Sequence, residues 1–100
     1  MCSSDLGDRI AAAMGDKSVL FMANHGVMVA APTIAEAFDK LYYLERACEV
    51  QVLALSTGQP LAELDASIAR RTKADFDQGS AYYQAHFDAV KPLLDRNYLR

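Results

Sequence analysis

The sequence predicts an α/β fold in which helices cover a short β-hairpin. Two apolar runs, residues 19–23 and 27–31, are separated only by Asn24-His25-Gly26, and such an Asn/Gly-containing turn is typical of a hairpin. A helix-start signal and a long helical apolar repeat follow the second run. With 100 residues, the chain is one small domain or part of one.

The first elements are a short helix and two strands. Apolar residues recur at helical spacing over residues 6–14, and Gly15 follows as a typical C-terminal cap. Both strands are nearly continuous apolar runs, which predicts that helices cover both faces of the hairpin. Two strands alone form a marginal sheet. The hairpin is therefore expected to be the end of a larger sheet, with an unpaired apolar edge.

A long amphipathic helix is predicted next. Residues 33–36, Thr-Ile-Ala-Glu, match a capping box, in which the Thr33 hydroxyl accepts from the Glu36 amide and the Glu36 carboxylate returns to the Thr33 amide. Apolar residues then recur every three or four positions over residues 34–55. The sequence Thr-Gly-Gln-Pro at residues 57–60 ends the helix.

Further helices are predicted after residue 60. A weaker periodicity leads to a break at Gly79-Ser80, and a last helix runs from about residue 81 to residue 94. Pro92 lies inside this last pattern and is expected to shorten or kink the helix. Cys48, on the apolar stripe of the long helix, is expected to be a small core residue rather than a nucleophile.

The N-terminus differs in character from the rest of the chain. Residues 1–6, Met-Cys-Ser-Ser-Asp-Leu, are what a common sequencing-adapter end would encode in frame, and are interpreted as a non-native leader. The alternative is a short natural start with Ser3 or Ser4 as a helix cap. Residues 7–100 are interpreted as one part of a larger domain.

Charge and composition argue against several classes of protein. The net charge is −3 and the basic residues are scattered, so no nucleic-acid partner is expected. No apolar stretch approaches the roughly 20 residues that span a bilayer, so no membrane partner is expected either. The first residues lack a secretory signal, and two cysteines do not make a disulfide framework. These observations predict a cytoplasmic protein.

His25 is the leading candidate for chemistry. Its turn holds an imidazole between two strands, and an imidazole can ligate a metal or move a proton. A metal site needs about three or four ligands, however, and a turn histidine that caps nearby backbone groups is the alternative. His86 is interpreted as an ordinary helix-face residue. The acidic candidates are interpreted as surface or capping residues: Glu36, Glu45, Glu49, Asp75 and Asp77.

Two segments resemble the C-terminal half of the class II aldolase/adducin family. They are residues 19–29, Val-Leu-Phe-Met-Ala-Asn-His-Gly-Val-Met-Val, and residues 32–38, Pro-Thr-Ile-Ala-Glu-Ala-Phe. Residues 41–48, running into Gln51, are similar to bacterial members. The resemblance implies a three-layer α/β/α sandwich assembled as a homotetramer. Residues 7–100 would then be the C-terminal part of that domain, with a helix, a β-hairpin, a long helix and C-terminal helices.

The resemblance also implies an activity. Family members are lyases, epimerases or dehydratases that use a divalent metal, usually Zn²⁺, to polarise the carbonyl of a sugar or sugar phosphate. Of the family's metal ligands, only the histidine of the Asn-His-Gly turn carries over, to His25, and the chain contains no His-x-His pair. The resemblance therefore implies a fragment of a metal-dependent lyase that is inactive alone. The alternative is a non-catalytic, adducin-like assembly module.

Overall fold

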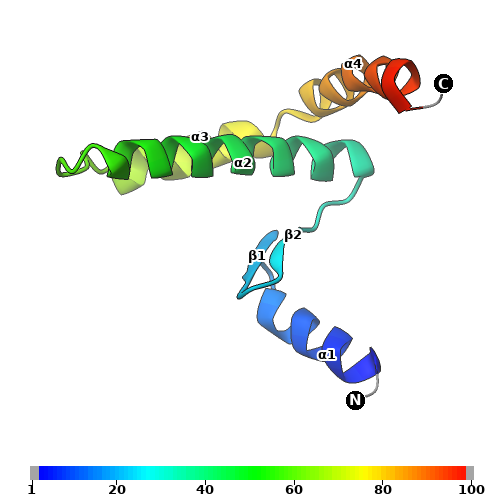
Figure 1. Cartoon of the computed structure of the whole chain (residues 1–100), viewed down its shortest axis with the longest axis horizontal. Coiled ribbons are helices and arrows are strands. Elements are labelled where there is room, and N and C mark those ends of the chain that lie inside the picture. Colours follow the sequence, from blue (N-terminus) through cyan, green and yellow to red (C-terminus); the bar gives the residue numbers. More distant parts are fainter. Residues whose placement is uncertain (1–2, 99–100) are drawn as a thin grey trace.

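The structure, a computed structural model, describes residues 3–98 and the side-chain environment of residues 5–94. The described chain contains four helices and one two-stranded sheet, in the order α1 (Ser3–Met14), β1 (Val19–Met22), β2 (Gly26–Val29), α2 (Ile34–Ser56), α3 (Ala66–Asp77) and α4 (Ser80–Tyr98). Figure 1 shows the hairpin between α1 and α2. The predicted mixture of helices and a hairpin is confirmed, but these residues alone do not build a three-layer sandwich.

Helix α1 ends as the sequence predicts. Gly15 has a φ of 53°, and its N–H donates to the Ala11 carbonyl at 3.0 Å. Glycine adopts this left-handed conformation without the steric cost that a Cβ brings. The helix begins at Ser3, inside the stretch interpreted as a leader, whereas residues 1 and 2 lie outside the described residues. The leader thus stays a prediction.

The hairpin is shorter than predicted but has the expected turn. Antiparallel pairing runs from Val19 opposite Val29 to Met22 opposite Gly26. The turn over residues 22–25 is closed by the His25 N–H, which donates to the Met22 carbonyl at 3.0 Å. Asparagine tolerates a positive φ better than most residues because its side chain bonds locally to the backbone. Asn24, at the third position, accordingly has a φ of 64°.

The start of α2 confirms half of the predicted capping box. The Glu36 N–H donates to Thr33 Oγ1 at 3.2 Å. The Glu36 carboxylate, however, lies 3.1 Å from Lys40 Nζ rather than returning to the Thr33 amide. This is an i,i+4 pair with the acid toward the N-terminus, the favourable orientation on a helix. The helix ends at Ser56, and Gly58 with a φ of 70° follows.

Helix α4 corrects the expectation for Pro92. The helix passes through Pro92 and continues to Tyr98 rather than ending near residue 94. Proline removes one N–H that would bond the Asp88 carbonyl. Because Asp88 is exposed, water can satisfy that carbonyl. Only one backbone hydrogen bond is lost, and the helix survives.

The core lies where α2 crosses α4. Ala35 and Tyr83 are the buried hydrophobic residues, and Asp39 is buried with them. The predicted cover of the hairpin is incomplete, because Phe21 remains 65% exposed between β1 and α2. Cys48 is also exposed, which corrects its assignment to the core: within the described residues, Phe21 and Val27 approach this turn of α2 but leave Cys48 open to solvent. Among the described residues, no helix has the length and apolarity required to cross a membrane.

Candidate functional site

His25 stands at the exposed tip of the hairpin. Its backbone is held by the bond to Met22 and by the adjoining positive φ angles of Asn24 and Gly26, 64° and 113°. The turn therefore positions the imidazole with the backbone constrained on both sides. Its side chain is exposed, as a ligand-binding group at a surface would be. The sequence-based placement of His25 at the turn of a hairpin is confirmed.

A groove of about 710 Å³ lies between α1 and the hairpin, next to His25. Leu6, Ile10 and Ala13 line it from α1, and Leu20 lines it from β1. Arg9, from α1, is a charged side chain in this otherwise largely apolar wall. Within residues 3–98, no group of three His, Cys, Asp or Glu side chains is arranged to hold a metal ion. The described residues therefore provide one possible metal ligand at this turn, His25, and do not form a complete metal site.

A second constellation lies in the core and was missed from the sequence. His86 Nδ1 on α4 lies 2.7 Å from Asp39 Oδ1 on α2, and the two residues are 47 positions apart. The Asp39 side chain is 5% exposed and that of His86 is 23% exposed. A carboxylate only accepts hydrogen bonds, so Nδ1–H donates and Nε2 is left for another partner. His86 is thus not an ordinary helix-face residue.

Aromatic rings surround this pair. The ring centroids of Tyr42 and Phe38 lie 4.8 and 5.2 Å from that of His86. Tyr43 connects α2 to α3, because its ring meets that of Phe76 edge-on at 5.5 Å. Aromatic pairs at these separations favour such tilted and edge-on arrangements. The rings hold the imidazole in place and leave its outer edge toward the space between the helices.

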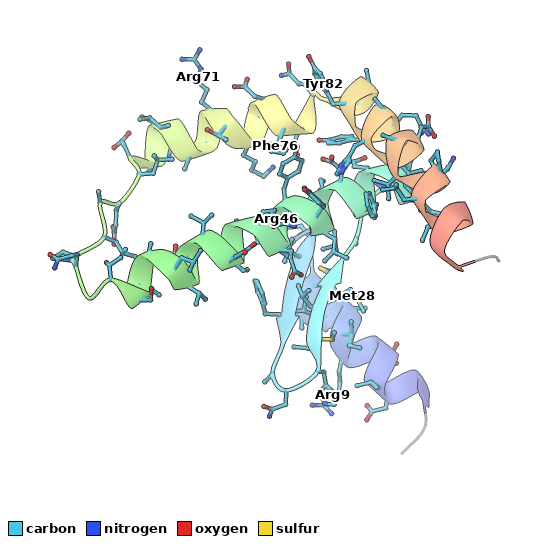
Figure 2. All side chains as sticks on the ribbon, turned by 45° about the horizontal axis from the view of Figure 1, so that its top comes forward. Arg9, Met28, Arg46, Arg71, Phe76 and Tyr82 are labelled. Carbon is cyan, nitrogen blue, oxygen red and sulfur yellow. The ribbon has the colours of Figure 1, made fainter. Side chains whose placement is uncertain are left out.

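That space is an open cavity of about 710 Å³ between α2, α3 and α4. Its lining includes the buried pair, four aromatic side chains and a second carboxylate: Asp39, His86, Tyr43, Phe76, Tyr82, Tyr83 and Asp75. Figure 2 shows Phe76 directed from α3 toward α2, across this space. Small-molecule sites have volumes of about 300–1,000 Å³ and combine apolar walls with a few polar groups. The cavity has that composition.

Tyr83 ties two walls of the cavity together. Its hydroxyl donates to the Phe76 carbonyl at the end of α3. Burial raises the pKa of the Tyr83 phenol above its ordinary value, and the nearby charge of Glu36 raises that pKa further. Both causes disfavour a negative charge at this position. Tyr83 is therefore held as a neutral hydrogen-bond donor.

Two of the acidic side chains considered from the sequence form ion pairs at the surface. Glu49 pairs with Arg46 at 3.0 Å, and the Asp77 carboxylate lies 2.6 Å from Lys73 Nζ. The Lys73 hydrogen bond lowers the pKa of Asp77. The one available signal for Asp39 was its position four residues after Ala35, on the face of α2 that α4 covers. That face could not be identified before α4 was placed.

Comparison with protein families gives one match. The model described as "Class II Aldolase and Adducin N-terminal domain" matches residues 1–52, which include the hairpin, His25 and most of α2. The C-terminal helices α3 and α4 lie outside the match. The chain is thus similar to that domain over slightly more than half its length.

Curated relatives agree with this match. A Caulobacter vibrioides protein named for aldolase class 2 is 44% identical over 52% of this chain and 20% of its own length. A Pseudomonas aeruginosa protein with the same designation is 38% identical over 60% of this chain and 23% of its own length. Human beta-adducin is 49% identical over 39% of this chain and 5% of its own length. The chain spans about a fifth of the first two relatives. No solved structure matches.

Proposed function

The chain belongs to the class II aldolase and adducin family, and from that premise we propose that it is part of a metal-dependent lyase. The substrate class is a carbonyl sugar or sugar phosphate, and the chain alone is inactive. The observation that carries the proposal is the exposed imidazole of His25 on a backbone-constrained turn. A neutral imidazole is a common ligand of Zn²⁺ and of other divalent metals.

His25 would be one ligand of a zinc centre whose other ligands come from residues beyond those described. Catalytic zinc sites use about three protein ligands and leave a further position open. Residues 3–98 supply no cluster of three potential ligands, so we assign no catalytic residue within them. The aldolase names of the bacterial relatives support the reaction class. These relatives are also several times longer than the matched segment, which leaves room in them for further metal ligands outside it.

The test uses the intact gene product that contains this segment. Replacing His25 by Ala should lower bound zinc, measured by mass spectrometry of the metal, together with retro-aldol cleavage of sugar phosphates. Lys17→Ala is the matched control, because Lys17 is an exposed residue beside the same hairpin. Normal zinc content in the His25→Ala protein would contradict the proposal, even if activity fell.

An adducin-like assembly module is the second candidate. The identity of 49% to human beta-adducin supports it, as does apolar surface along α2, where Val50 and Leu53 are 65% and 61% exposed. Large exposed apolar patches mark interaction surfaces. In either case we propose that further copies of the chain cover this surface, as in a homotetramer. An intact gene product that forms the oligomer but binds no zinc would favour the assembly module over the lyase.

A further inference from the structure

The Asp39 carboxylate is buried in the wall of the cavity between α2, α3 and α4. Its side chain is 5% exposed, and among the described residues its one hydrogen-bond partner is His86. A buried carboxylate is costly unless it is paired and its remaining lone pairs are satisfied. A cation in that cavity would lie next to this carboxylate.

The walls of the cavity suit an organic cation. Each of the three helices contributes at least one aromatic side chain: Tyr43 from α2, Phe76 from α3, and Tyr82 from α4. Asp75 adds a second carboxylate, and the lining formed by the described residues contains neither Lys nor Arg. The faces of aromatic rings attract ammonium groups, most strongly where water is excluded. The cavity therefore combines negative charge with aromatic walls.

The state of Tyr83 agrees with this assignment. Burial and the charge of Glu36 raise the pKa of its phenol, so the surroundings resist an additional negative charge. Lys40 acts in the opposite direction but more weakly than Glu36. Burial would penalise a ligand of either charge, whereas the charges of Glu36, Asp77 and Asp39 oppose an anion and not a cation. The carboxylates around the cavity, rather than its burial, thus favour a cation.

We propose that the cavity between α2, α3 and α4 binds a small organic ammonium ion, with its cationic head against Asp39 and the aromatic walls. The lining of the site comes from α2, α3, α4 and a residue between α3 and α4, and it includes neither the hairpin nor His25. It is thus independent of the proposed lyase activity. His86 positions the carboxylate through its Nδ1–H and does not itself need to contact the ligand.

Choline and its uncharged isostere 3,3-dimethylbutanol provide the test, because they differ in charge and match in shape. Each is titrated into the 100-residue chain while the ring resonances of His86 and the tyrosines are followed by NMR. Choline should shift these resonances and bind at least about tenfold more tightly than the isostere, a difference of about 1.4 kcal/mol. Equal binding of the two, or no choline binding up to about 10 mM, would overturn the proposal and leave His86 as the sole compensation of Asp39.

Variants locate the site. Asp39→Asn should weaken choline binding by about tenfold or more, because it removes the charge with little change in shape. If that variant loses its helical circular dichroism, Asp75→Asn and Tyr82→Ala decide, because both side chains are exposed and neither supports the core. Each of these two should weaken choline binding, whereas Asp16→Asn, 88% exposed in the loop before β1, should not. Unchanged binding in both cavity variants would overturn the assignment.

Discussion

Replacing Tyr83 by Phe tests the junction between α3 and α4 through a single oxygen atom. Tyr83 is 5% exposed, and its hydroxyl donates to the Phe76 carbonyl. Phenylalanine keeps the buried ring and removes only this donor. The change in the free energy of unfolding should therefore report the hydrogen bond rather than the packing of the ring.

The size of the effect follows from what the Phe76 carbonyl retains. A typical hydrogen bond contributes about 0.5–1.5 kcal/mol net. The Gly79 N–H still donates to the same carbonyl at 3.2 Å, so the acceptor keeps a partner after the substitution. The loss should then be at most about 1 kcal/mol, equivalent to about 4–8 °C in Tm for a domain of this size.

The effect should depend on pH in a defined direction. Burial raises the pKa of Tyr83 above its ordinary value of 10.0 in the folded chain. A group whose folded pKa is raised stabilises the fold fully below its unfolded pKa and loses that stabilisation as pH rises through the folded pKa. The free energy of unfolding of the wild-type chain should therefore fall above pH 10 as Tyr83 titrates. Tyr83→Phe lacks the titrating group and should not show this contribution. The stability difference between the two proteins should shrink in that range.

Urea unfolding followed by far-ultraviolet circular dichroism measures both effects, at neutral pH and above pH 10. Tyr82→Phe is the matched control, because Tyr82 is adjacent in sequence and 80% exposed. This control should stay within about 0.5 kcal/mol of wild type. Wild-type stability in Tyr83→Phe, or equal losses in the two variants, would refute the assignment of the hydroxyl to the α3–α4 junction.

Three further substitutions test local features. Gly26→Ala should destabilise the chain by about 1 kcal/mol or more in urea unfolding. The cause is the backbone φ of 113° at Gly26 rather than a steric clash, because an added Cβ would have open space. Asn24→Gly, at the neighbouring positive φ, should be tolerated. Thr33→Ala should cost about 1 kcal/mol and reduce helical circular dichroism, and Thr33→Ser should not. Phe21→Ser should lower the average mass in sedimentation equilibrium, because Phe21 is 65% exposed; an unchanged mass would exclude this face from self-association.

Local signals made much of the fold predictable. Thr33 caps α2, Gly15 ends α1, and Asn24 forms the hairpin turn, because each acts on backbone groups within about four residues. Predictions made from the residue pattern of a single helix were less reliable. Pro92 was expected to shorten or kink α4, but the helix continues. Cys48 was expected in the core, but in the described chain its part of the stripe stays exposed.

The sequence by itself determined the end of α1, the start of α2, the turn that presents His25, and the resemblance of that turn and α2 to a known family. The tertiary structure alone decided that the buried centre lies between α2 and α4, where Asp39 meets His86 across 47 residues. Caps and turns are short-range interactions, whereas the environment of a buried carboxylate depends on which helix packs over it. Asp39 became a candidate site only when α4 covered it.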